Sequence, residues 1–279
     1  MIRLEKWPDL KSRIATLAIA IPALVIGLLF LPPSGFGILI GITIVLSSWE
    51  HTSITLGAGH RAVQVMSGLG ALVVGIAIYV TSTKPTEPNG EVVIATLTGA
   101  VIVLFVTNLF VSQDVKSASS RLGSSLVPLV YCGVLPAHLA LLRHDAGVLW
   151  IGLALIVTWG SDIAAYLVGK SIGKHKLAPL MSPNKTFEGA IASFVAAVVG
   201  VLILKLLYMK TLSLGHALLL AVLANVLAQL GDLWESLIKR SGGVKDSSGI
   251  IPGHGGVLDV MDGLCFAAPW LYYSHRYLV

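Results

Sequence analysis

Apolar residues dominate this 279-residue chain and occur in long runs that short polar segments interrupt. A helix needs about 20 apolar residues to cross the hydrocarbon core of a bilayer, and several runs come close to that length. These runs cover residues 14–32, 35–52, 62–82, 92–112, 122–142, 147–168, 188–209, 214–238 and 259–277. The pattern therefore predicts an all-α fold, a polytopic membrane helical bundle of about nine transmembrane helices.

The composition supports a membrane setting. Hydrophobic residues make up 55% of the chain and charged residues only 12%, with a mean hydropathy of +0.86. A soluble domain averages roughly 25% charged residues, because its surface must face water. We therefore expect the lipid bilayer to surround most of the protein. The pI near 9.2 is explained by cytoplasmic loops rich in Lys and Arg, so we expect no nucleic acid partner.

The N-terminal segment superficially resembles a secretory signal peptide, because basic residues precede the run 14–32. That run is longer than a typical signal-peptide core, and it ends at Pro32-Pro33 without a cleavage site. We interpret it as an uncleaved first transmembrane helix.

The distribution of basic residues predicts the orientation. In a nine-helix arrangement, fourteen of the 19 Lys and Arg residues lie on the side of the N-terminus. The positive-inside rule then places the N-terminus in the cytoplasm. The two long polar loops, 169–188 and 239–258, fall on this same side. We expect residues 1–145 to form a packing and dimer region and residues 146–279 to form a catalytic region whose active site faces the cytoplasm.

Carboxylates are concentrated in one short segment, since five of the 14 acidic residues lie between Asp232 and Asp262. Asn225, Gln229, Asp232 and Ser236 are spaced four, three and four apart, which places them on one face of a helix. Polar residues in a spanning helix face the bundle interior or a water-filled cavity.

Asp259 and Asp262 lie three apart at the start of the last predicted helix. Because the last two helices are consecutive and antiparallel, their cytoplasmic ends can meet and bring both residues near Asp232. Three converging carboxylates repel one another unless a cation joins them, and all-oxygen ligands favour Mg²⁺. We expect one or two such cations. The alternative is that Asp259 caps the helix and Asp262 interacts with its dipole.

Basic residues and glycines lie between these carboxylates, namely Lys239, Arg240, Lys245 and the segment Gly253-His254-Gly255-Gly256. Glycines let backbone N–H groups approach an anion closely, and cations offset its charge. Together with a metal, these residues predict a polyphosphate substrate. Taken alone, the basic residues are more typical of an ordinary cytoplasmic loop than of a substrate site.

The loop 169–188 has a similar character, with Ser182, Asn184, Lys185 and Thr186 ahead of an apolar run. Thr186 is a candidate helix start, and helix N-termini bind phosphate. The alternative is a lysine-rich loop that contacts anionic lipid headgroups. Upstream, Asp162 is an intramembrane carboxylate and a functional candidate, although pairing with a loop lysine explains it equally well.

The C-terminal segment resembles the signature of phosphatidate cytidylyltransferases, the CDP-diacylglycerol synthases. The signature reads S-x-x-K-R, four residues, K-D, then P-x-H-G-G-x-x-D-R-x-D. It stands here as Ser236-Leu237-Ile238-Lys239-Arg240, Lys245-Asp246 and Pro252-Gly253-His254-Gly255-Gly256-Val257-Leu258-Asp259-Val260-Met261-Asp262. Val260 replaces the usual Arg. The stretch from Asp162 to Gly189 is also similar to the family, with Asn184 where Lys is frequent.

The resemblance implies a membrane enzyme of phospholipid biosynthesis, in a bacterial inner (plasma) membrane, that converts CTP and phosphatidate to CDP-diacylglycerol and pyrophosphate with Mg²⁺. It also implies a homodimer. We assign Asp232, Asp259 and Asp262 to metal binding, and Asp246 as a fourth ligand or as an orienter of Lys245. Phosphate contacts are assigned to Lys185, Lys239, Arg240 and Lys245. Weaker assignments to substrate binding are Asp162, Ser182, Asn184, Thr186, Ser236, His254, Gly255 and Gly256.

Two other functions fit parts of the pattern. A CTP-dependent polyprenol-type lipid kinase would share the metal and the nucleotide but would release CDP. An ion-coupled secondary transporter could use Asp162 and Asp232 as an ion site. Transporters place such sites near the bilayer midplane, whereas the carboxylates here cluster at one interface.

Overall fold

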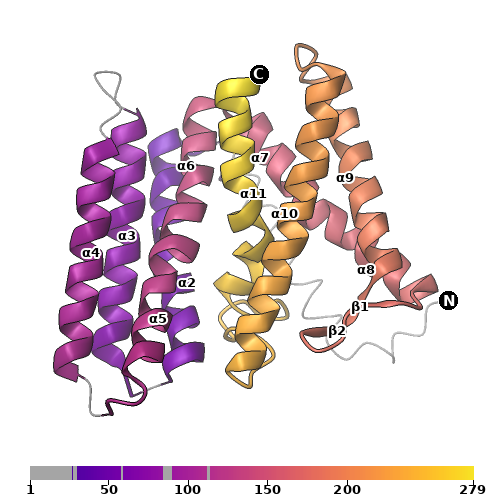
Figure 1. The fold of residues 1–279 in the computed structure, drawn as a ribbon. Helices are drawn as coiled ribbons and strands as arrows, with labels where there is room; N and C mark the ends of the chain where they lie inside the picture. The colour runs from indigo at the N-terminus through magenta and orange to yellow at the C-terminus, as the bar shows by residue number, and fades with distance from the viewer. Residues whose placement is uncertain (1–26, 28–29, 58, 84–89, 112–113) are drawn as a thin grey trace.

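The protein is an almost entirely helical bundle (Figure 1), seen here in a computed structural model that describes residues 27, 30–57, 59–83, 90–111 and 114–279. Six helices are uninterrupted in this part of the chain: α2 (Pro33–Leu56), α3 (Arg61–Thr83), α4 (Gly90–Val111), α9 (Phe187–Leu207), α10 (Leu214–Ser241) and α11 (Val257–Leu278). Two more each contain a π-helical segment. They are α5 (Ala118–Pro128), η2 (Leu129–Val134) and α6 (Leu135–Asp145), and then α7 (Val148–Leu155), η3 (Ile156–Gly160) and α8 (Ser161–Ile172).

Seven of these helices are long and apolar enough to cross a membrane, so the protein is a polytopic integral membrane protein. They match seven of the predicted spans, from 35–52 to 214–238. The predicted span 259–277 forms α11, which is not among these seven and carries Asp259 and Asp262 in its first two turns. The predicted first span, 14–32, lies outside the described residues apart from 27 and 30–32. The total of nine stays a prediction.

The helix ends follow from local sequence. Pro33 stands at the first position of α2, where its missing N–H costs nothing. Thr186 caps α9, since its hydroxyl oxygen accepts a hydrogen bond from Gly189 N at 3.1 Å. The expectation of a helix start at Thr186 is therefore confirmed. Ser213 caps α10 in the same way.

Helix α11 lies in the middle of the bundle, with α2 to α6 on one side and α8 to α10 on the other (Figure 1). It contacts α10, α6, α2 and α7. The loop 169–188 contains a small antiparallel hairpin, β1 (Lys176–Ala178) and β2 (Ser182–Thr186). This hairpin and the α10–α11 loop lie at the same end of the bundle (Figure 1), as the sequence predicted.

Asn225 connects three helices in the interior beside the hairpin. It is fully buried, and its Nδ2 lies 3.0 Å from Val157 O in η3, 2.9 Å from Ser161 Oγ and 3.0 Å from Ser193 Oγ. A π segment interrupts the regular i→i−4 hydrogen bonding of a helix, and here a side-chain donor reaches one of its carbonyl groups. The predicted polar face of α10 therefore begins with a residue that holds α10 to η3, α8 and α9.

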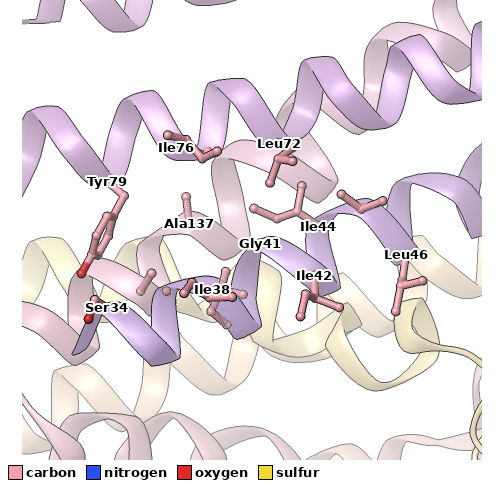
Figure 2. A pocket seen from close by; sticks show the side chains of 15 residues that line it. Ser34, Ile38, Gly41, Ile42, Ile44, Leu46, Leu72, Ile76, Tyr79 and Ala137 are labelled. Atoms are coloured by element: carbon pink, nitrogen blue, oxygen red, sulfur yellow. The ribbon is translucent and has the colours of Figure 1, made fainter. Parts of the chain in front are cut away.

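An apolar groove of about 630 Å³ runs along α2 where it meets α3 and α6 (Figure 2). Gly41, Leu72 and Ala137 are among the residues that line it, and its polar side chains are the hydroxyls of Ser34 and Tyr79. No carboxylate, amine or imidazole of the described residues lines this groove. It offers no group for catalysis, and the candidate active site lies elsewhere.

Candidate active site

A cluster of three carboxylates stands where α10 meets α11. Asp232 and Glu235 from α10 and Asp262 from α11 each offer an oxygen, and these oxygens lie within 4.8 Å of one another. The two α10 residues share a face because they are three positions apart. Gly231 permits the close approach of α11, since an added Cβ would lie 2.5 Å from Asp262 O. The close contact of the two helices thus brings the three side chains together.

Glu235 is the most deeply placed member of the cluster, with no exposed surface. Its Oε1 has no hydrogen-bond partner among the described residues. Its Oε2 forms an ion pair with Lys239 Nζ at 2.6 Å. A buried carboxylate oxygen without a donor is costly, unless a cation occupies the space beside it.

The local charges are consistent with a divalent cation. Asp232 forms an ion pair with Lys185, and Lys239 pairs with both Glu235 and Asp259. With Asp262, four carboxylates face two ammonium groups, which leaves a formal charge of −2. An all-oxygen ligand set of this charge suits a hard ion such as Mg²⁺. The residues present therefore fit the metal that the sequence analysis expected.

Asp259 lies beside this cluster, and its oxygens are held by protein groups. Its Oδ1 accepts a hydrogen bond from Lys239 Nζ at 2.5 Å. Its Oδ2 accepts bonds from Ser247 N at 2.8 Å and Gly256 N at 2.7 Å. This is the capping role that the sequence left open for Asp259, and metal binding by this residue stays a prediction.

A polar cavity of about 720 Å³ adjoins the cluster and shares Asp232 with it. Helices α8, α9 and α10 and the hairpin enclose the cavity. Residues with side-chain donors, acceptors or charges in its wall are Asp162, Tyr166, Lys170, Lys176, Asn184, Lys185, Thr186, Ser193, Gln229 and Asp232. Three lysines in one cavity favour a phosphate-bearing ligand. Asp162, Asn184, Lys185 and Thr186 were all predicted as site residues, and the structure brings them together here.

Arg240 joins the two polar loops. Its Nε donates to Met181 O at 3.1 Å, and its Nη1 donates to Val244 O at 2.9 Å. Ser182 follows Met181 in the hairpin and is half-buried. The sequence predicted that the two loops share one face of the protein, and these contacts confirm it.

The remaining predicted residues lie in or near the loop between α10 and α11. Ser236 is buried on α10, His254 is half-buried, and Lys245 and Asp246 are exposed. Asp246 does not belong to the carboxylate cluster. The roles of Lys245 and Asp246, like that of His254, whose Nδ1 has no partner among the described residues, stay predictions.

The glycine-rich loop uses its own N–H groups internally. Gly255 N donates to Ile251 O at 3.0 Å, and Gly256 N donates to Asp259 Oδ2. Gly255 has a φ of 88°, a conformation that favours glycine. In this structure the two amides therefore serve the fold, and substrate binding by Gly255 and Gly256 remains a prediction.

Two carboxylates near the site were not assigned from the sequence. Glu235 lies three residues after Asp232 and four before Lys239, so its helical spacing pointed to the same face. Glu50 on α2 contacts the α10–α11 loop, and it is a carboxylate within a long apolar run. Such an intramembrane residue is a functional candidate by default, which is the signal that would have identified it.

Comparison with known proteins identifies the family of the chain. A model of the cytidylyltransferase family matches residues 11–278. A phosphatidate cytidylyltransferase of Brucella suis is 47% identical over 146 residues, which is 52% of this chain and 54% of the relative. One of Bacillus subtilis is 38% identical over 178 residues, covering 62% of this chain and 66% of the relative.

The chain thus spans about half the length of the Brucella relative. A phosphatidate cytidylyltransferase of Haemophilus influenzae is matched over its full length, at 31% identity over 288 residues and 97% of this chain. Because the family model covers nearly the whole chain and a relative is matched from end to end, the chain belongs to the phosphatidate cytidylyltransferase family.

Proposed function

We propose that this protein transfers the cytidylyl group of CTP to phosphatidate, forming CDP-diacylglycerol and releasing pyrophosphate. The observation that carries the proposal is the position of the carboxylate cluster. Asp262 lies within the family's C-terminal signature, and Asp232 and Glu235 lie just before its first residue, Ser236. A lysine-lined cavity adjoins the cluster. The relative of Haemophilus influenzae is a phosphatidate cytidylyltransferase, and this name gives the substrate class.

The reaction forms one bond and breaks one. A phosphate oxygen of phosphatidate attacks the α-phosphorus of CTP, and the bond from that phosphorus to the β-phosphate oxygen breaks. A phosphate monoester has a second pKa of about 6, so the nucleophile is largely ionised at neutral pH. The protein therefore needs no strong base. It must neutralise charge, align the reactants and stabilise the leaving pyrophosphate.

Asp232, Glu235 and Asp262 would hold Mg²⁺, as one or two cations. The bound metal would neutralise phosphate charge and orient the triphosphate. Asp259 would support this set by holding Lys239 beside Glu235. The assignment differs from the sequence-based one because Glu235 takes the place of Asp259 in the cluster.

Basic residues of both loops would bind the phosphates. Lys185 lines the polar cavity and contacts Asp232, so it would reach a phosphate held beside the metal. Arg240 in the last turn of α10 and Lys245 in the following loop are exposed and would meet CTP as it arrives from solution. Asp246 would orient Lys245.

Smaller polar residues would complete the substrate contacts. Asp162, Asn184 and Thr186 line the cavity. Ser182, Ser236 and His254 lie on the elements around the cluster and would donate hydrogen bonds to the substrates.

The active site would face the cytoplasm of a bacterial inner membrane. Most Lys and Arg residues fall on the side of the two polar loops, which the positive-inside rule places in the cytoplasm. CTP would arrive from solution, and phosphatidate would reach the cavity from the cytoplasmic leaflet. Residues 146–279 would carry the catalysis, while residues 1–145 would mainly support packing in a homodimer.

The test uses purified protein, phosphatidate vesicles, Mg²⁺ and CTP labelled in both the cytosine and the γ-phosphate. The expected lipid product contains cytosine but no γ-label, with the γ-label in pyrophosphate. A lipid product that carries the γ-label alone would identify a kinase. Substrate flux across sealed vesicles without CTP turnover would identify a transporter. Either result would overturn the proposal.

A further inference from the structure

Glu50 is a buried carboxylate of α2 that binds the loop leading into α11. It is 2% exposed and lies about 200 residues earlier in the chain than its partners. Ser248 Oγ donates to its Oε1 at 2.6 Å. Val257 N donates to Oε1 at 3.0 Å, and Leu258 N donates to Oε2 at 2.7 Å. A side chain of the N-terminal half thus fixes the first turn of the last helix.

This arrangement gives hydrogen-bond partners both to the Glu50 carboxylate and to the N-terminal N–H groups of α11. The first N–H groups of a helix lack intrahelical partners, and Glu50 accepts hydrogen bonds from two of them in α11. The N-terminal end of a helix carries partial positive charge, which favours a carboxylate there. No Lys or Arg within the described segments forms an ion pair with Glu50. Its buried charge is therefore stabilised mainly by these donors.

Gly256 is part of the same contact. A Cβ at this position would overlap the Glu50 carboxylate and Ser247 Oγ. Glycine is therefore required here because the Glu50 side chain comes so close to the loop backbone. In the structure, the anion that approaches this loop is a carboxylate of the protein itself. Binding of the polyphosphate substrate by the loop stays a prediction.

Ser247 extends the contact to the active site. Its Oγ lies 3.0 Å from Glu50 Oε2 and 2.6 Å from Asp259 Oδ2. Asp259 in turn holds Lys239, which pairs with Glu235 of the carboxylate cluster. A chain of direct contacts thus runs from Glu50 through Ser247, Asp259 and Lys239 to Glu235.

We propose that Glu50 is a positioning residue of the active site, which sets the α10–α11 loop and the start of α11 so that Asp259 and Lys239 hold the carboxylate cluster in place. The expected effect of Glu50 on turnover rests on the proposed function. The expected effect of Glu50 on the α10–α11 loop does not depend on that function. Mutation of a residue that holds a metal ligand in place typically lowers metal affinity or activity 10–100-fold.

The decisive variant is Glu50→Gln, which keeps the size of the side chain but replaces one acceptor oxygen with an NH₂ group that faces N–H donors. Glu91→Gln is the matched control, because Glu91 is exposed at the start of α4. Each protein is assayed for kcat and for the KM of CTP. Hydrogen exchange followed by mass spectrometry reports on peptides that cover residues 242–258.

We expect Glu50→Gln to lower kcat by about tenfold or more while the KM for CTP changes less than about threefold. Exchange should rise in the 242–258 peptides and stay unchanged in peptides from α3, α4 and α9. Wild-type kcat and exchange in Glu50→Gln would overturn the proposal. So would a fall in kcat accompanied by a uniform rise of exchange in all helices, because that pattern indicates general destabilisation.

Ser248→Ala is a second variant that removes one donor to Glu50. It should give a smaller effect of the same kind, and the double variant should be no worse than Glu50→Gln alone, because the two residues share one interaction. Strictly additive effects would contradict the proposal. If wild-type protein forms no CDP-diacylglycerol, the proposed function fails, and the exchange data still decide whether Glu50 positions the loop.

Discussion

Lys239 is the residue whose removal tests the charge arrangement of the site most directly. Its Nζ lies 2.6 Å from Glu235 Oε2 and 2.5 Å from Asp259 Oδ1. The side chains of Lys239, Glu235 and Asp259 are 12%, 0% and 9% exposed. Lys239→Met keeps an apolar side chain of similar length and removes the charge. The substitution would leave two adjacent carboxylates buried without their shared cation.

The distances give the size of the effect. Two unit charges 2.5 Å apart attract by about 7 kcal/mol at an effective dielectric constant near 20, and desolvation offsets part of that attraction. Removing one partner of a buried ion pair typically costs about 3–5 kcal/mol. For a chain of this size we expect the unfolding temperature to fall by roughly 10 °C.

The measurement is thermal unfolding in detergent, without divalent cations and then with Mg²⁺. Lys210→Met is the control, because Lys210 is exposed between α9 and α10. If Mg²⁺ binds the cluster, it should restore part of the lost stability, because it supplies positive charge near Glu235. A ligand that binds only the folded protein stabilises it by an amount that grows with the logarithm of its concentration once that concentration exceeds its Kd.

Two results would refute this reasoning. If Lys239 served only the substrate, Lys239→Met would behave like Lys210→Met, so equal unfolding temperatures would rule out the structural role. A stable Lys239→Met protein with a strongly raised KM for CTP would instead support the phosphate contact that the sequence predicted.

Three further outcomes are expected. Asp262→Asn should lower Mg²⁺-dependent turnover about 100-fold or more, and near-normal activity would remove Asp262 from the metal site. Asn225→Leu should cost about 2 kcal/mol in unfolding free energy, because Val157 O loses a buried donor; unchanged thermal unfolding would contradict this. Gly256→Ala should reduce activity at unchanged expression, because its methyl group would displace Glu50, and wild-type kcat would show that the loop adapts without cost.

The membrane fold could be predicted because lipid imposes a simple requirement. Each spanning helix must present about 20 apolar residues, and this length is visible in the sequence without tertiary information. Seven predicted spans correspond to long apolar helices in the structure. The π segment η3 could not be predicted in this way, because one of its carbonyl groups, Val157 O, accepts a hydrogen bond from Asn225 of another helix.

The choice between Asp259 and Glu235 shows where the prediction of the site reached its limit. Asp259 and Asp262 are three residues apart on α11, so they differ by about 60° around the helix and about 4.5 Å along it. Both were expected near Asp232. Which of them reaches the cluster depends on the depth and rotation of α11 against α10. That packing is set partly by Gly231, and no local pattern encodes it.

The contacts of Glu50 could not be predicted from local sequence either. Its partners lie about 200 residues away, so only the fold brings them together. The contacts divide the site into two parts. Asp232, Glu235 and Asp262 form an open set of oxygens suited to a cation, whereas Glu50 and Asp259 are saturated by donors from the chain. Lys239 connects the two parts, because it pairs with both Glu235 and Asp259. Substitutions of Glu50 or Asp259 should therefore alter turnover by displacing Lys239 and the carboxylate cluster. Substitutions of Asp232, Glu235 or Asp262 should alter turnover by weakening metal binding.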